Sequence, residues 1–194
     1  MYIIVIILSS FLNIANTEIE SDTFKDPRDG NEYKTVVIGG QTWMSENLKY
    51  KTEGAIPYNN NTDNIALYGY LYDWETSQNV CPKGWHLPNE EEWNQLIDFL
   101  GGKNKAGGKM KSKSAEANWT SPNRFATNSS GFNAFPSAIS KSGVFSSLKD
   151  VAYFWSSEAE CTSAYTVYLT YKAGFADKKV TPKTDMVAIR CIKN

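Results

Sequence analysis

The sequence has no excess of charge of one sign, because 20 Lys and Arg side chains nearly balance 21 Asp and Glu side chains. Proteins that bind nucleic acid or anionic membrane surfaces usually carry a strongly basic face, since phosphate groups attract cations. Neither nucleic acid nor a membrane surface is therefore indicated as a partner. The 194 residues, 41% of them hydrophobic, are enough for one well-buried core, and no change of composition marks a second domain.

Long hydrophobic runs are also missing, apart from 11 mainly apolar residues at Tyr2–Leu12. A helix needs about 20 apolar residues to cross a bilayer, so we expect no stable membrane span. A short apolar run followed by small and polar residues is typical of a secretory signal peptide. The alternative, a buried first strand, is disfavoured by the charged stretch Glu18–Asp29. We predict a signal peptide at residues 1–16 and one domain at residues 17–194, secreted or held at the cell surface.

Cysteine is scarce, and Cys81, Cys161 and Cys191 are widely spaced. This spacing excludes the close CxxC pairs of zinc ribbons and thiol redox motifs. In an oxidising compartment, three cysteines give one disulfide and one remaining thiol. The alternating segment 187–192 predicts an inward-facing strand position for Cys191, whereas Cys161 lies in a polar run. We therefore predict a disulfide between Cys81 and Cys191.

Catalytic motifs are absent: the sequence has no Walker loop, no GxGxxG, no HExxH and no GxSxG. His86 is the only histidine, and the sequence shows no nucleophile or metal partner for it, so we interpret it as structural. In the polar loop Asn59–Asp63, only Asp63 is a carboxylate, whereas calcium sites usually use several. We expect no catalytic residue, no metal site and no cofactor.

The clearest local signal is a helix at residues 89–100. Asn89 can cap its N-terminus, and Glu92, three residues later, completes a capping box. An apolar stripe follows at positions 93, 96, 97 and 100, which places Trp93 in the core, and Gly101 ends the helix. A second short helix at 104–114 would contain two adjacent glycines, which cost about 2 kcal/mol relative to alanine.

Strand signals dominate the rest of the chain. Two short strands within residues 31–43 flank a Gly39-Gly40 turn. Further strands are predicted at residues 134–139, 152–157, 164–171 and 186–192. Because helices come early, strands come later and no βαβ alternation is present, the pattern predicts an α+β domain.

Six ordered strings carry a resemblance to a known family. They are Asp29–Leu48, YGYLYDW at 68–74, CPKGWHLPNEEEW at 81–93, GFNAFPSA at 131–138, FWSSE at 154–158 and AIRCIKN at 188–194. Together they resemble the major paralogous domain first noted in Fibrobacter succinogenes. That family is similar to the C-type-lectin-like superfamily near the formylglycine-generating enzymes, whose LPTEAEW and RCV elements resemble Leu87–Trp93 and Arg190–Ile192. The resemblance implies a C-type-lectin-like fold, with short strands, one or two helices and long loops.

The same resemblance implies an exported or surface-attached bacterial protein. It adds location and fold but little chemistry. The missing catalytic motifs favour a non-enzymatic recognition module, with a structural or adhesive envelope component as the alternative and an enzyme related to the formylglycine-generating enzymes as the least favoured. Those enzymes hold copper with two cysteines close together, whereas Cys161 and Cys191 lie 30 residues apart. Calcium-dependent lectins use an EPN or QPD triplet and a later WND, and this chain offers only WSSE at Trp155–Glu158.

Superfamily relatives place their binding surface on loops between the later strands, here within residues 156–183. Tyr165, Tyr168 and Tyr171 are the amphipathic anchors of this stretch. In a strand, Tyr165 and Tyr168 point to opposite faces, so at most one of them faces a given partner. Trp119 has polar neighbours, and we expect it to be exposed. We predict that these four residues bind an unidentified protein or carbohydrate ligand.

Overall fold

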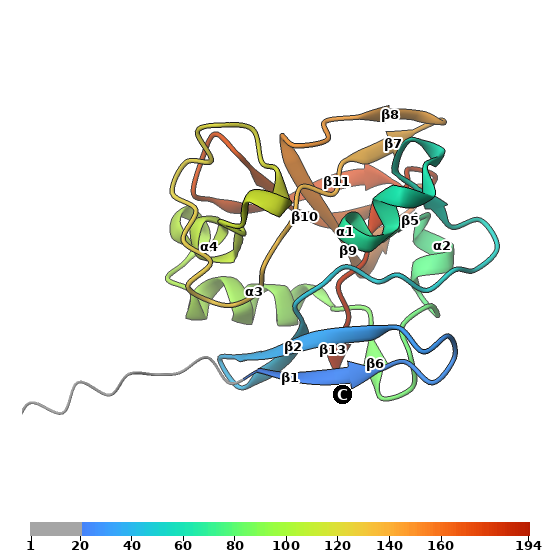
Figure 1. Ribbon diagram of the computed structural model, residues 1–194, viewed down its shortest axis with the longest axis horizontal. Helices are drawn as coiled ribbons and strands as arrows, with labels where there is room; N and C mark the ends of the chain where they lie inside the picture. The colour runs from blue at the N-terminus through green and yellow to red at the C-terminus, as the bar shows by residue number, and fades with distance from the viewer. Residues whose placement is uncertain (1–20) are drawn as a thin grey trace, which may run out of the picture.

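The computed structural model describes residues 21–194, so the predicted signal peptide at residues 1–16 lies outside the described residues (Figure 1). The chain has a mixed α+β fold, consisting mostly of strands with a few short helices. The helices are α1 Ile65–Tyr68, α2 Trp74–Ser77, α3 Glu90–Phe99 and α4 Lys103–Met110, with 3-10 helices at Tyr58–Asn60, Thr62–Asn64 and Ala115–Ala117.

The strands form two main sheets. A five-stranded sheet has the order β1-β2-β3-β13-β6, and a six-stranded sheet has the order β11-β10-β9-β12-β5-β4. The first contains β1 Ser21–Lys25, β2 Glu32–Ile38, β3 Gln41–Met44, β6 Trp85–His86 and β13 Ile192–Lys193. The second contains β4 Ile56–Pro57, β5 Tyr70–Tyr72, β9 Val151–Glu160, β10 Ser163–Thr170, β11 Ala176–Pro182 and β12 Val187–Ala188. A separate hairpin pairs β7 Ile139–Lys141 with β8 Val144–Ser146.

The hairpin predicted around Gly39-Gly40 is confirmed as β2–β3, in which Ile38 pairs with Gln41. Both glycines have positive φ angles, 60° and 84°. A two-residue turn with positive φ at both positions matches the twist of the strands, and only glycine, asparagine and aspartate adopt it readily. The pair Gly39-Gly40 therefore sets the register of these two strands.

Helix α3 lies between the two sheets, as Figure 1 shows, and its buried residues belong to the main core. Trp93 and Leu96 on its buried face are 1% and 0% exposed. The ring of Trp93 lies 4.8 Å from that of Trp43 in β3 and 5.9 Å from that of Phe154 in β9. The helix predicted at residues 89–100 is thus confirmed, and its apolar stripe contacts both sheets.

The predicted capping box starts α3. The Asn89 side chain accepts from the Glu92 backbone N–H at 2.9 Å, and the Glu92 carboxylate accepts from the Asn89 N–H at 2.8 Å. The backbone N–H of Glu90 donates to the Glu158 carboxylate at 2.7 Å. Glu158 follows the Trp155-Ser156-Ser157 run in β9, so it places a negative charge at the positive end of the helix.

The second helix, α4, begins one residue before the predicted position and ends four residues before it. Its two glycines allow close packing against neighbouring backbone. A Cβ atom on Gly107 would lie 1.9 Å from the carbonyl oxygen of Phe175, and one on Gly108 would lie 2.5 Å from that of Phe125. The glycines reduce helix propensity, but any larger residue would separate the helix from these loops.

The strand predicted at residues 186–192 is wrong as a single element. The segment forms β12 in the six-stranded sheet and then β13 in the five-stranded sheet. Because it crosses between the sheets, both of its faces are covered: Ala188 and Arg190 are as buried as Ile189 and Cys191. The alternation of residues at 187–192 therefore did not predict which side chains are buried, because all of them are.

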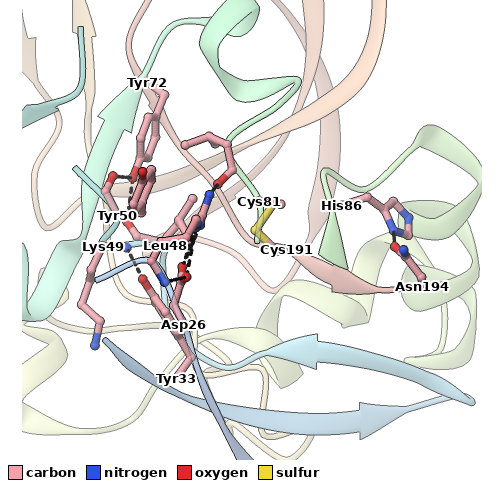
Figure 2. Close-up of a disulfide and its surroundings, with 12 residues drawn as sticks. Asp26, Tyr33, Leu48, Lys49, Tyr50, Tyr72, Cys81, His86, Cys191 and Asn194 are labelled. Atoms are coloured by element: carbon pink, nitrogen blue, oxygen red, sulfur yellow. Dashed lines mark hydrogen bonds and ion pairs between the residues drawn. A yellow bond between two sulfur atoms is a disulfide. The ribbon is translucent and has the colours of Figure 1, made fainter. Parts of the chain in front are cut away.

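The disulfide between Cys81 and Cys191 is present, and it closes a separation of 110 residues. Cys191 is completely buried in a second core, which also contains Tyr33 and Tyr72 (Figure 2). The Tyr72 hydroxyl donates to the Tyr50 carbonyl at 2.6 Å, and the Tyr33 hydroxyl accepts from the Lys49 N–H at 3.0 Å. These bonds attach the loop after β3 to both sheets. Cys161 is a free, exposed thiol at the β9–β10 turn.

Two further differences concern strands. The predicted strand at residues 134–139 is wrong: Ala134 and Ala138 form only isolated bridges, and β7 starts at Ile139. Pro136 lacks a backbone donor, and Asn133 and Ala138 have positive φ angles, which interrupts extended pairing. Strand β1 was not predicted, because its charged and polar residues do not alternate with apolar ones.

Candidate functional site

A pocket opens between α3 and the β10–β11 edge of the six-stranded sheet, with a volume of about 190 Å³. Trp93, Ile97 and Val167 are among its apolar lining residues, and Asn94 and Tyr165 are among its polar ones. We call it the α3–β11 pocket. Tertiary folding creates it, since its residues come from two helices and three strands.

Two ion pairs connect β11 to the helices across this pocket. The Lys178 ammonium lies 2.7 Å from the Glu90 carboxylate of α3, and the Lys103 ammonium of α4 lies 2.7 Å from Asp177. Lys178 also lies over the Tyr165 ring, 4.2 Å from its centroid. Such exposed pairs contribute at most about 1 kcal/mol each, so their main effect is to orient charged groups around the opening.

Trp93 has an unused donor beside the pocket that it lines. Its side chain is buried, and its indole N–H finds no acceptor within the described part of the chain. An unsatisfied buried donor costs about 1–3 kcal/mol.

The structure separates the three predicted tyrosines. Tyr165 lines the α3–β11 pocket, and its hydroxyl bonds to Glu160. Tyr168 lies on the other face of β10, stacked on Tyr153 at 5.7 Å. Tyr171 follows the strand and packs against the main core. The expectation that Tyr165 and Tyr168 point to opposite faces is therefore met, and they belong to different surfaces.

Trp119 is buried, which corrects the expectation that it is exposed. Its side chain packs in the main core, and its indole N–H donates to the Ala134 carbonyl at 3.0 Å. Polar sequence neighbours suggested exposure, but the side chain is only 9% exposed. Trp119 is thus placed to support packing.

His86 has partners that the sequence did not reveal. One ring nitrogen lies 2.7 Å from the Glu92 carboxylate, and the other lies 2.7 Å from the Asn194 side-chain oxygen, as Figure 2 shows for Asn194. Glu92 was assigned to the capping box alone, but its second oxygen reaches His86. The histidine therefore links the start of α3 to the last residue of the chain.

The sequence placed Trp93 in the core and gave no reason to select Glu90, Lys178 or Asp177. The alternation of residues on β11 gives no signal for an ion pair with a helix 88 residues earlier in the chain. Among residues 21–194, no group of three or more His, Cys, Asp or Glu side chains is arranged to hold a metal ion. No helix in the same range is long and apolar enough to cross a membrane.

The fold and pocket define a class: a disulfide-linked α+β domain in which two sheets are joined by a central helix. Residues 36–193 match the model of the Fibrobacter succinogenes major domain, and the chain belongs to that family. Neither a curated protein nor a solved structure matches the chain.

Proposed function

We propose that this chain is a non-enzymatic recognition module, exported to a bacterial cell surface, whose domain belongs to the C-type-lectin-like superfamily. The observation that carries the proposal is the α3–β11 pocket, around which lie a tyrosine ring, charged groups and Trp93, whose N–H has no acceptor among residues 21–194. Pockets of mixed apolar and polar lining are the usual sites for small ligands. The disulfide is compatible with an oxidising compartment.

The lining favours a ligand, or part of a ligand, that carries hydroxyl or carbonyl oxygens. Such an oxygen accepts from Trp93, while the Asp98 and Asp177 carboxylates accept from hydroxyl groups. Apolar carbons contact Ile97 and Val167. Both a carbohydrate and a polar protein side chain combine such oxygens with apolar carbons. We therefore retain the two ligand classes expected from the sequence, carbohydrate and protein.

The test is a glycan array and a pull-down of surface proteins with the chain from Thr17 to Asn194. Tyr165→Ala is expected to weaken binding of the ligand found, about tenfold or more, because aromatic anchors are frequent binding hot spots. Tyr168→Ala is the matched control, since it changes the same residue type on the opposite face of β10. Equal losses in both variants would place the binding surface elsewhere.

A structural or adhesive envelope component is the second candidate. It predicts self-association of the chain without a glycan or protein ligand, measured by sedimentation. Turnover of a substrate by the purified chain would support the enzyme alternative and contradict the proposal.

A further inference from the structure

A second pocket, separate from the α3–β11 pocket, has Arg190 among its lining residues. It has a volume of about 220 Å³ and lies between the loop after β3, the α1 segment and the loop that contains Asn133. Ser45 and Asn47 are among its lining residues. We call it the Arg190 pocket. None of its residues belongs to the α3–β11 pocket.

The guanidinium of Arg190 is buried without a complete set of partners. The residue is 1% exposed, and Nη1 donates to the carbonyl oxygens of Met44, at 3.0 Å, and Phe132. Nη2 donates to the side-chain oxygen of Asn47 at 2.9 Å. Nε finds no acceptor among the described residues. Three of the five N–H groups are therefore used.

The charge of Arg190 is also incompletely balanced. No carboxylate of residues 21–194 forms an ion pair with it, although the rings of Phe132 and Phe154 lie 4.4 and 5.3 Å from the guanidinium carbon. Burial lowers the pKa of Arg190 to about 9, and the charge of Glu46 opposes this shift. A buried cation is costly unless an anion accompanies it.

The charged lining of the pocket has a net charge of plus one. Lys34, Lys49 and Arg190 are its cations, and Glu46 and Glu116 are its anions. Glu46 lies 3.3 Å from Lys49, so these two largely neutralise each other. Lys34 and Arg190 then face the single carboxylate of Glu116. A ligand with one negative charge completes this balance.

We propose that the Arg190 pocket binds a small organic carboxylate. The Nε and Nη2 groups lie on the same edge of the guanidinium. In general, this edge donates two parallel hydrogen bonds to a planar carboxylate. Asn47 and Ser45 provide further polar groups, and the volume suits an organic acid the size of a sugar acid. A phosphate, with a charge near minus two, would exceed the net charge of plus one of the lining.

The Nε–H resonance of Arg190 in ¹H–¹⁵N NMR spectra tests this proposal directly. The chain has three arginines, so Arg28→Lys and Arg124→Lys variants assign the signal. Sodium acetate and sodium glucuronate are titrated into the full chain at constant ionic strength, with sodium chloride and inorganic phosphate as the other arms. We expect a saturable downfield shift with both carboxylates.

Lys34→Gln is expected to weaken carboxylate binding about two- to fivefold, because it removes one partly screened charge. Lys51→Gln is the matched control, an exposed lysine outside this pocket, and it leaves the affinity unchanged. Tyr165→Ala also leaves it unchanged, which separates this site from the α3–β11 pocket. No saturable shift, an equal shift with chloride, or tighter binding of phosphate would overturn the proposal.

Discussion

Lys111 and Arg190 are both fully buried cations, and within residues 21–194 neither forms an ion pair with a carboxylate. They differ in how their donors are used. The Lys111 ammonium donates to the carbonyl oxygens of Arg124, Thr170 and Ala173, each at 2.8 Å. An ammonium has three protons, so this carbonyl cage uses all of them. Arg190 leaves two N–H groups over.

This difference distinguishes a structural cation from one that can bind a ligand. The three carbonyls around Lys111 belong to the loop residue Arg124, to Thr170 at the end of β10 and to Ala173 in the loop after it. The ammonium therefore holds these segments against the end of α4. No donor remains for another molecule. At Arg190, the carbonyl bonds fix the guanidinium, the Nε–H has no acceptor among residues 21–194, and the residue lines a polar pocket. Four predictions sharpen or break this comparison.

The largest effect is expected from removing the disulfide with Cys81→Ala and Cys191→Ala together. Closing a 110-residue loop stabilises the fold by about 4 to 5 kcal/mol on the chain-entropy model. Urea unfolding measures this loss, with Cys161→Ser as the control for removing a thiol. The amides of Met44 and Leu48 donate to the carbonyls of Cys191 and Ile189, next to Arg190. Hydrogen exchange at these two amides should therefore accelerate before exchange at Lys111 does. Uniform acceleration would mean that the two regions open together.

The second effect is the loss of the carbonyl cage in Lys111→Met, with an expected cost of about 3 kcal/mol. Three buried carbonyls lose their donor at about 1–3 kcal/mol each, and removal of the buried charge offsets part of this cost. Lys113→Met, two residues later and exposed, is the matched control. If Lys111→Met unfolded at the same urea concentration as the parent, the cage would contribute nothing to stability.

The third effect is a pH dependence that the substitution Lys111→Met removes. Burial lowers its pKa to about 8 from an ordinary value of 10.5, so the unfolded chain binds more protons between these values. The free energy of unfolding contributed by this group is therefore lowest below pH 8 and rises with pH across that window. Burial raises the pKa of Tyr33, and of Tyr72, in the folded state, which destabilises the fold above about pH 10.

We therefore compare the parent with Lys111→Met between pH 7 and pH 9.5, below the range of the tyrosines. The difference in unfolding free energy between the two proteins should grow with pH. Parallel curves would contradict the prediction and would mean that the carbonyl cage holds the ammonium at its ordinary pKa.

The sequence predicted those parts of the fold that depend on local patterns. The capping box at Asn89, the apolar stripe of α3 and the Gly39-Gly40 turn each act within a few residues, and each is present. The Cys81–Cys191 disulfide was predictable because Cys191 has an inward-facing strand position, whereas Cys161 lies in a polar run and was left unpaired. The crossing of residues 187–192 between two sheets was not predictable, because burial on both faces comes from partners elsewhere in the chain.

Both pockets depend on contacts between distant segments, which local patterns do not encode. Lys178 meets Glu90 across 88 residues, and Arg190 meets Asn47 across 143. Of the four predicted ligand-binding residues, Tyr165 alone lines the α3–β11 pocket, and Trp119 was wrongly expected at the surface. The sequence does contain one signal for Arg190: it is the single charged residue in the apolar run VAIRCI, which is typical of a buried charge.

The smallest effect concerns a basic residue that does have a carboxylate partner. His86 and Glu92 lie 2.7 Å apart, but their side chains are 38% and 21% exposed, so water screens the interaction. His86→Ala should therefore cost only about 1 kcal/mol, through its bonds to Glu92 and Asn194. Glu92→Gln is the control, because its amide oxygen can still accept from the Asn89 N–H. Urea unfolding measures the loss of stability in His86→Ala and in Lys111→Met. Equal losses would break the comparison, because the depth of burial would then no longer decide how much a basic side chain contributes to stability.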